Sequence, residues 1–342
     1  MDVNEFKSRL KSGELGGCYM FVGEEDYLKK HYLGMLRDSI VSDATLAAFN
    51  HSLFEGAEID FALVNDAIKS PPVFAEYKLV EWRYPNIDKM KESDLSLLED
   101  TVEMLREYPY AALAIIVSDG DLTLGVGKRE SKFERRFRDK LYLMNFPKST
   151  ETQLLAWLKR HFDAYSVNVS ADTLRELIFR SGHSMSVLNS EVDKLCYLAL
   201  SRGMDTVNAD TVREAASSTP ECDTFALSNA VLERNKAGAY TALDEMKSRR
   251  VDPLMILGMM AKSYSELVNV LMMQGDGMGS ADIASALGMN PYRLKLYLSA
   301  SSRFTKERAA RIAEELVRVD TGAKFGGVTG YTAIEMFIAK CV

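Results

Sequence analysis

Strand and helix patterns alternate along the first 147 residues of this 342-residue chain, and strand patterns then stop. Short runs rich in apolar, β-branched or aromatic residues, of the kind found in buried strands, lie at 18–22, 48–54, 78–82, 112–117 and 141–145. Helical patterns such as 60–69 and 94–107 lie between them. Because parallel strands need long crossovers, this alternation predicts an α/β domain with a mainly parallel sheet covered by helices.

Helical patterns alone fill the chain after Pro147. An apolar stripe runs along residues 149–162, Ser170 can start and Gly182 can end a further helix, and another helical pattern spans 186–200. The same kind of pattern continues to the last residue. We therefore predict an α/β domain over residues 1–147, a small helical domain over 148–217 and a larger helical domain over 218–342.

The composition is that of an ordinary globular protein, with 47% hydrophobic residues and a formal net charge of -7. This charge argues against a uniformly basic nucleic-acid binder but leaves room for a local basic face. The four cysteines form no C-x-x-C pair, and no apolar run approaches the length of about 18 residues that a membrane helix needs. We expect a cytoplasmic protein without a disulfide framework, a zinc site or a membrane partner.

Residues 17–37 have the frame of a nucleotide-binding loop, with an apolar run, a turn at Gly23 and an amphipathic helix from about Asp26. A phosphate-binding loop of this kind is rich in glycine and ends in Gly-Lys-Ser/Thr, whose amides, lysine and hydroxyl hold phosphates and magnesium. Here Glu24, Glu25 and Asp26 follow the glycine. Three carboxylates repel a triphosphate, although they suit the N-terminus of a helix. We therefore expect no nucleotide and no other cofactor.

No strand in the first domain ends in the paired acidic residues that an ATPase uses to organise magnesium and water. The run 77–84 supplies only Glu81, and the next strand ends in the acidic segment 118–121, for which a plain turn is favoured over a metal site. The four histidines show no ligand spacing, and no serine lies in a G-x-S-x-G elbow. The sequence predicts neither catalytic nor metal-binding residues.

The segment 70–74 (SPPVF) lies between a predicted helix and a predicted strand. Its two prolines, Pro71 and Pro72, stiffen the backbone and can present Val73 and Phe74 as a preorganised apolar tip for a partner's pocket. Composition alone favours a different interpretation, in which Phe74 fills the core of its own domain. Both hypotheses stay open on these residues.

A basic run at 128–140 (KRESKFERRFRDK) carries seven basic and three acidic side chains. Such a run is usually a solvated helix face. The alternative is a salt-sensitive contact with the phosphates of DNA. The candidate residues for this contact are Lys128, Arg129, Lys132, Arg135 and Arg136.

A second pattern related to DNA lies at residues 281–298. Gly288 and Leu294 have the spacing of a helix-turn-helix, and Arg293 and Lys295 lie on its second helix. The pattern lies inside a continuous helical region and not near a terminus. Packing within a helical bundle is therefore the favoured interpretation.

Five segments, in order and across all three predicted domains, resemble the delta subunit of the bacterial DNA polymerase III clamp loader. They are YMFVGEEDYL (19–28), SPPVFAEYKLV (70–80), SVLNSEVDKLCYLAL (186–200), FALSNAVLERN (225–235), and IASALGMNPYRLKLYL (283–298) with Arg303 and Phe304. The resemblance covers essentially the whole chain. It implies a degenerate AAA+-like parallel-sheet domain, a small helical lid-like domain and a C-terminal helical collar domain that oligomerises.

The resemblance also implies a function, which is to bind the ring-shaped sliding clamp (the beta subunit) and open it for loading onto primed DNA. The implied partners are the ATPase and delta-prime subunits of the loader, and sister subunits hydrolyse the ATP. The chain then belongs to a nucleotidyltransferase holoenzyme without a catalytic site of its own. Two alternatives remain, an active AAA+ ATPase with an irregular loop and a helix-turn-helix DNA-binding regulator.

The resemblance assigns clamp binding to specific residues. In the family an apolar residue followed by phenylalanine enters a hydrophobic pocket on the clamp, and this pair maps onto Val73 and Phe74, with Pro72 before it. The match reverses the preference for a core position of Phe74. No glutamine precedes the pair in this chain, so the flanking contacts depart from the usual pattern.

Overall fold

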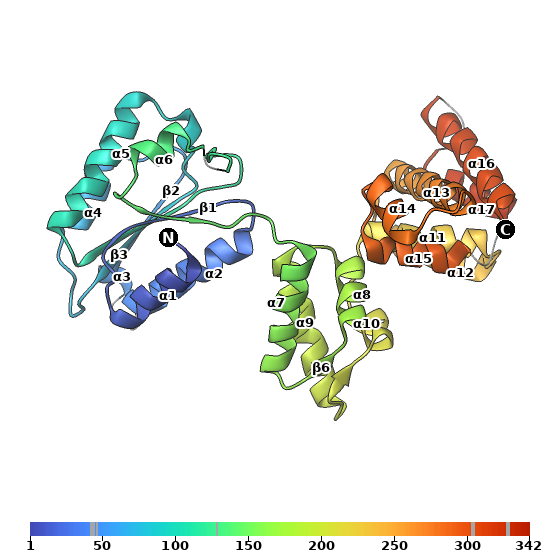
Figure 1. Cartoon of the computed structure of the whole chain (residues 1–342), viewed down its shortest axis with the longest axis horizontal. Coiled ribbons are helices and arrows are strands. Elements are labelled where there is room, and N and C mark those ends of the chain that lie inside the picture. Colours follow the sequence, from blue (N-terminus) through green and yellow to red (C-terminus); the bar gives the residue numbers. More distant parts are fainter. Residues whose placement is uncertain (42–44, 46, 128, 302–304, 326–328) are drawn as a thin grey trace. The chain divides into compact units, whose positions relative to one another are not determined.

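The computed structural model describes residues 1–41, 45, 47–127, 129–301, 305–325 and 329–342, and it divides into two compact units, 1–151 and 152–342 (Figure 1). The first unit is an α/β domain and the second is almost entirely helical, which confirms the predicted fold class. Among the described residues, no helix is both long and apolar enough to cross a membrane.

The first unit is built on one five-stranded parallel sheet. Its elements in chain order are α1 (Val3–Ser12), β1 (Gly17–Val22), α2 (Asp26–Ile40), α3 (Ala47–Asn50), β2 (His51–Glu55), α4 (Phe61–Lys69), β3 (Lys78–Arg83), a 3-10 turn (Ile87–Lys89), α5 (Glu92–Met104), a second 3-10 turn (Leu105–Glu107), β4 (Ala111–Ile116), α6 (Lys132–Arg136) and β5 (Tyr142–Asn145). The strand order is β2-β3-β4-β1-β5. The chain therefore reverses direction across the sheet beside β1, and the crevice at the carboxyl ends of β1 and β4 is where such sheets bind ligands.

Alternate residues of β1 face opposite helical layers. Cys18 and Met20 pack in the core beneath α4, α5 and α6, whereas Tyr19 and Phe21 pack in the core beneath α1 and α2. Figure 1 shows the two layers, with the blue helices α1 and α2 on one face of the sheet. All these side chains are buried, as expected for the central strand of a sheet covered on both faces.

The strand predicted at 48–54 is wrong in its first half. Residues 47–50 form the short helix α3, and β2 begins only at His51. Two alanines at the start of the segment favour helix. The strand that follows lies at the edge of the sheet, where Leu53 stays 47% exposed. Phe49 in the helix and Phe54 in the strand made the two elements look like one apolar run, so the sequence predicted a single strand.

Helix α1 was not predicted from the sequence, although its end signals are present. The Asp2 carboxylate accepts hydrogen bonds from the amides of Asn4 and Glu5, both over 2.8 Å, and Gly13 ends the helix in a left-handed conformation (φ 77°). Asp at the N-cap and glycine just past the end are the usual boundary residues. The helix buries Phe6 against the sheet.

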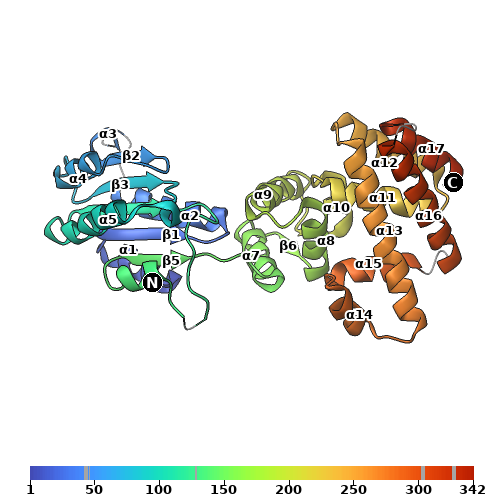
Figure 2. The same cartoon turned by 90° about the horizontal axis from the view of Figure 1, so that it is seen from above.

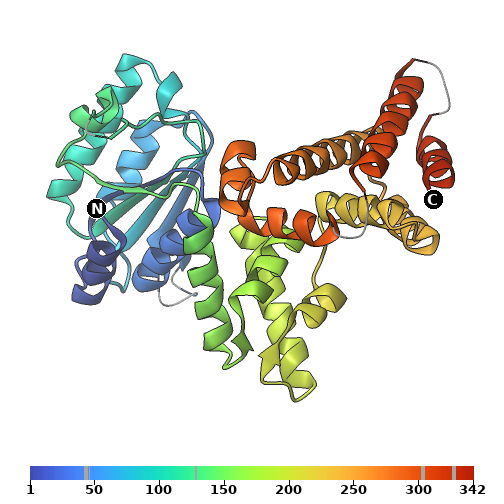
Figure 3. The same cartoon turned by 45° about the vertical axis from the view of Figure 1, so that its right-hand side comes forward.

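The second unit is built almost entirely of helices (Figure 3). Its elements are α7 (Glu151–Ala164), β6 (Asn168–Val169), α8 (Ala171–Ser181), α9 (Met185–Ser201), β7 (Thr206–Val207), α10 (Ala209–Ala215), α11 (Pro220–Leu232), α12 (Lys236–Ser248), α13 (Pro253–Gly275), α14 (Ser280–Leu287), α15 (Pro291–Ser301), α16 (Lys306–Lys324) and α17 (Tyr331–Cys341). The predicted start at Ser170 and end at Gly182 of α8 are confirmed. The expectation that strands stop after Pro147 is wrong in one detail, because β6 and β7 form a two-residue parallel pair, too short to leave a period-two pattern.

One continuous core holds the helices from α11 to α17 together. Leu227 of α11, Leu257 of α13, Leu316 of α16 and Phe337 of α17 are fully buried in it. The separation of this unit into a domain over 148–217 and a domain over 218–342 stays a prediction.

Candidate functional site

The turn that joins β1 to α2 is closed against the end of β5. Gly23 has a left-handed backbone (φ 103°), and a Cβ at this position would lie 2.4 Å from the carbonyl oxygen of Phe146. The Glu25 N–H donates to the same oxygen over 3.0 Å. This approach requires glycine and engages an amide that a phosphate-binding loop would direct at its ligand.

Lys29, in the first turn of α2, is fully buried, and its ammonium group is bonded within the fold. Nζ donates to the carbonyl oxygen of Val117 over 2.8 Å and lies 2.8 Å from a carboxylate oxygen of Asp26. Val117 directly follows β4, so the lysine ties the start of α2 to the carboxyl end of that strand. In a phosphate-binding loop, the lysine of this region would contact the nucleotide.

The space beside the turn is small and acidic. A cavity of about 190 Å³ lies at the ends of β1, β4 and β5, with Glu24 and Asp119 among its lining residues. Ligand pockets usually span about 300–1,000 Å³. Burial and the adjacent Asp26 carboxylate raise the pKa of Glu25. The geometry therefore supports the expectation that this loop holds no nucleotide.

Glu81, the acidic residue of β3, is fully buried and is surrounded by basic side chains. One carboxylate oxygen lies 2.6 Å from Arg37 Nε and 3.0 Å from His51 Nε2, and the other lies 2.8 Å from Arg83 Nη2. Burial by itself raises the pKa of Glu81, but the hydrogen bonds from His51, Arg37 and Arg83 outweigh it and lower the pKa to about 2. Glu81 is thus a charged group that joins α2, β2 and β3.

The acidic segment 118–121 after β4 has the hydrogen bonds of an ordinary turn. The Asp121 N–H donates to the carbonyl oxygen of Ser118 over 3.2 Å, and the Asp121 carboxylate accepts from the side-chain amide of Asn86. Within the described ranges, no three His, Cys, Asp or Glu side chains lie close enough together to hold a metal ion. These contacts support the interpretation of this segment as a plain turn.

The apolar tip, residues 70–74, connects α4 to β3 and presents an aromatic side chain to solvent. Phe74 is 91% exposed and Val73 is 36% exposed, whereas Pro72 is half-buried. The Phe74 backbone is left-handed (φ 51°), which is uncommon for an aromatic residue. The interpretation that Phe74 fills its own core is therefore wrong. Contact of the apolar tip with a clamp stays a prediction.

The described residues of the basic run fall into two groups, those in ion pairs and those without an ion pair to another described residue. Arg136 reaches α5, where its guanidinium lies 2.5 Å from a carboxylate oxygen of Glu92 and 2.7 Å from one of Glu99. Lys140 is paired in the same way with Glu99 and Glu103. These two cations stabilise the packing of α5 and are not free to bind another anion.

The other candidate DNA contacts are open to solvent. Arg129, Lys132 and Arg135 are exposed and form no ion pair with another described residue. Lys128 lies outside the described residues. The loop between β4 and α6, which carries Arg129, projects from the sheet (Figure 2). A role of these residues in DNA binding stays a prediction.

The helix-turn-helix pattern forms α14 and α15, and the basic residues of the second helix are paired. Arg293 lies 2.7 Å from a carboxylate oxygen of Glu221 and 2.9 Å from one of Glu266, and Lys295 Nζ lies 3.0 Å from a carboxylate oxygen of Asp172. A helix that reads bases needs such side chains free. The structure supports packing within the helical bundle.

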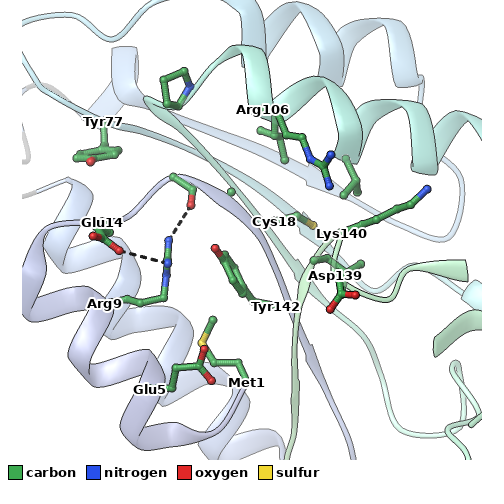
Figure 4. A pocket seen from close by; sticks show the side chains of 16 residues that line it. Met1, Glu5, Arg9, Glu14, Cys18, Tyr77, Arg106, Asp139, Lys140 and Tyr142 are labelled. Carbon is green, nitrogen blue, oxygen red and sulfur yellow. Dashed lines mark hydrogen bonds and ion pairs between the residues drawn. The ribbon is translucent and has the colours of Figure 1, made fainter. Parts of the chain in front are cut away.

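A larger cavity, of about 730 Å³, lies at the amino ends of the strands (Figure 4). Arg9 crosses it, with its guanidinium 4.4 Å from the ring centre of Tyr142 and hydrogen bonds to the Gly16 carbonyl oxygen (3.4 Å) and Glu14 (3.5 Å). The cavity therefore lies at the amino ends of the strands, whereas the turn at Gly23 lies at their carboxyl ends. The guanidinium of Arg9 inside the cavity is already bound within the chain.

Sequence reasoning missed Lys29 and the basic partners of Glu81. Asp26 and Lys29 have the three-residue spacing of a helical ion pair, which was the available signal. The same spacing is common on solvated helix faces, so only the fold shows that this lysine is buried. Arg37 and His51 are distant in sequence from Glu81, and no local pattern connects them.

The parallel sheet with a strand, turn and helix at the place of a phosphate-binding loop, followed by helical domains, defines a degenerate AAA+-like protein. Residues 19–125 match the family described as DNA polymerase III, delta subunit, and residues 221–341 match the DNA polymerase III delta subunit, C-terminal domain. The chain therefore belongs to the DNA polymerase III delta subunit family.

A sequence relative and a solved structure show the same relationship. DNA polymerase III subunit delta of Bacillus subtilis (strain 168) is 21% identical over 341 residues, which cover 97% of this chain and 94% of that protein. The solved structure of the Bacillus subtilis DNA clamp loader delta protein superimposes with a TM-score of 0.59 and 20% identity and covers 99% of each chain. At this identity the superposition shows the shared fold alone.

Proposed function

We propose that this chain is a non-catalytic clamp-loader subunit that binds the sliding clamp through Val73 and Phe74 and opens the ring for loading onto primed DNA. The observation that carries the proposal is the 91% exposure of Phe74 on a tip stiffened by two prolines. A large apolar side chain held in solvent costs free energy unless a partner buries it. The closed turn at Gly23 supports the non-catalytic part of the proposal.

Burial of the apolar tip accounts for a substantial part of an interface. Transfer of a valine and a phenylalanine side chain into a pocket contributes on the order of 3 to 5 kcal/mol before ordering costs. The stiff backbone lowers those ordering costs because little conformational freedom remains to be lost. Ring opening then follows from differential affinity, since a subunit that binds the open form of the clamp more tightly than the closed form shifts the ring toward opening.

The test is equilibrium binding of the cognate clamp to wild-type protein and to the double variant Val73→Ala, Phe74→Ala. We expect the double variant to lose about 3 kcal/mol, on the order of 100-fold in affinity, while its circular dichroism and thermal midpoint stay near wild type. The matched control is Leu63→Ala on α4, which truncates another exposed apolar side chain, 57% exposed, outside the apolar tip. Equal affinity of wild type and double variant would refute the assignment.

Partners in the assembled loader are also part of the proposal. We place the ATPase and delta-prime subunits beside this chain because of its family. We place primed DNA against Arg129, Lys132 and Arg135 because these cations are exposed and form no ion pair with any residue that the structure describes. DNA affinity falls as salt concentration rises, and changing the three residues to glutamine is expected to make this fall less steep. The magnitude of the slope of the logarithm of affinity against the logarithm of salt concentration should decrease by about 2 to 3. An unchanged slope would remove DNA from this surface.

Two specific observations disfavour the alternative functions. An active ATPase needs turn amides and a lysine free for phosphate, whereas Glu25 and Lys29 are bonded to Phe146 and Val117. A helix-turn-helix regulator needs a free recognition helix, whereas Arg293 is only 20% exposed and is paired with carboxylates.

A further inference from the structure

We infer that Asn50 is a positioning residue that holds the apolar tip in its outward, partner-ready form. The inference rests on the proposed function for its biological meaning. Its structural basis is a pair of hydrogen bonds between the Asn50 side chain and the backbone of Val73, the residue immediately before Phe74.

The Asn50 side chain pairs with both backbone groups of one residue. Its Nδ2 donates to the Val73 carbonyl oxygen over 2.8 Å, and its Oδ1 accepts from the Val73 N–H over 2.7 Å. Asn50 is only 1% exposed. A primary amide is the side-chain group that can donate to and accept from one backbone residue at once, so it holds the segment much as a neighbouring strand would.

Asn50 is itself fixed to the sheet. It is the last residue of α3, and the next residue, His51, begins β2 in register with Leu79 of β3. His51 Nε2 lies 3.0 Å from the buried Glu81 carboxylate. The side chain that holds the apolar tip therefore extends from the residue directly before a strand of the sheet, and elements of the scaffold hold a binding group more precisely than loops do.

The apolar tip needs such a support because the Phe74 ring can adopt two positions, one in solvent and one in a neighbouring hollow. Its left-handed backbone is strained for an aromatic residue and persists only when its neighbours fix it. A hollow of about 490 Å³ lies beside Phe74, with Leu10, Leu15 and Ile40 among its lining residues. An unsupported tip can relax its backbone and lower the ring into this hollow, against its leucine and isoleucine side chains. Asn50 keeps the ring outside.

The test measures two quantities, the hydrogen–deuterium exchange of the Val73 amide in the free protein and the affinity for the clamp. In wild type, the Val73 amide must exchange slowly with deuterium, and Asn50→Ala must speed this exchange. If the outward form then falls to about a tenth of the molecules, clamp affinity falls about tenfold. Asn50→Asp has the same shape but turns a carboxylate oxygen toward the Val73 carbonyl oxygen, and the repulsion between the two is expected to loosen the segment and speed Val73 exchange as well. The matched control is Asn65→Ala, which removes the acceptor for the Thr101 hydroxyl elsewhere in the unit. It is expected to change neither Val73 exchange nor clamp affinity.

A double-mutant cycle separates positioning from loss of fold. In the background of Val73→Ala with Phe74→Ala, the Asn50→Ala change is expected to cause no further loss of clamp affinity. A tenfold loss that persists there overturns the inference, and so does rapid Val73 exchange in wild type or unchanged affinity despite faster exchange. If the double tip variant itself binds like wild type, the proposed function fails, and Val73 exchange still decides whether Asn50 holds the tip.

Discussion

The buried carboxylate of Glu81 makes the first unit sensitive to acid. Its pKa of about 2 lies below its ordinary value of 4.5, so the stability that it contributes is present above about pH 4.5 and is lost as the pH falls toward 2. Glu81→Gln leaves Arg37 and Arg83 without a counter-charge and is expected to cost on the order of 3 kcal/mol at pH 7. Chemical unfolding followed by circular dichroism from pH 7 to pH 2.5 measures this difference.

The pH dependence supplies the control for this prediction. The difference in unfolding free energy between wild type and Glu81→Gln is expected to shrink as the carboxylate becomes protonated in the unfolded chain and then in the folded one. A difference that stays constant across this range would mean that the variant acts through packing and not through charge.

A second prediction at the residue scale concerns Lys29. Lys29→Met keeps the length of the apolar stem but removes a donor to the Val117 carbonyl oxygen, and it is expected to cost about 1–2 kcal/mol. Lys30→Met, at the exposed neighbouring position, is the matched control and is expected to change stability by less than about 0.5 kcal/mol. Thermal unfolding distinguishes the two. Equal stability of both variants would show that the buried ammonium does not tie α2 to β4.

At this scale the sequence predicted groups whose roles depend on near neighbours. The carboxylates after Gly23 could be read directly, because consecutive charges act locally. The residues of the apolar tip alone favoured a core position for Phe74, and only the family resemblance indicated an outward one. Asn50 could not be predicted, since its partner lies 23 residues away and nothing local distinguishes it from an exposed asparagine.

At the scale of elements, the turn between β1 and α2 depends on one glycine. Gly23→Ala puts a Cβ 2.4 Å from a backbone oxygen at a positive φ and is expected to destabilise the protein by more than about 2 kcal/mol. Gly34→Ala, inside α2 with no atom within 4 Å of the added Cβ, is expected to stabilise it by about 0.5–1 kcal/mol. The midpoint of denaturant unfolding is expected to fall for Gly23→Ala and to rise for Gly34→Ala. Tolerance of alanine at position 23 would mean that the turn is not closed as described.

The apolar tip separates stability from function. Phe74→Gly removes a side chain that is 91% exposed and relieves the strain of a left-handed backbone. The free energy of unfolding is therefore expected to fall by no more than about 0.5 kcal/mol. Clamp capture is expected to be lost in the same variant. Thermal unfolding and clamp binding are measured on one preparation, and a large loss of stability would show that Phe74 packs within its own domain.

Elements followed from the sequence where one pattern dominated. The central strands β1 and β4 are continuous apolar runs, and capping residues marked α8. The prediction failed at 48–54, where two alanines turn the start of an apparent strand into helix, and at β6 and β7, whose pairing depends on contacts between residues 168 and 206. Long-range pairing of two-residue strands leaves no periodicity to detect.

At the scale of the whole molecule, the chain keeps the frame of a nucleotide-binding domain. The polar groups at the carboxyl ends of its strands bind other parts of the same domain. Lys29 and the Glu25 amide, which face the place of a nucleotide, bind Val117 and Phe146 instead. The sheet thereby becomes a rigid support for a tip on the connection between α4 and β3. As a member of a DNA polymerase III subunit family, the chain serves DNA replication, and in our account its own contribution is binding energy and not hydrolysis.

The most direct test is a calorimetric titration of the cognate sliding clamp into the isolated full-length chain, without nucleotide and then with magnesium and ATP. The account predicts one affinity under both conditions, no heat from ATP alone, and loss of on the order of 100-fold in affinity when Val73 and Phe74 are changed to alanine. Clamp binding that requires ATP, or that survives the loss of both side chains, would contradict it.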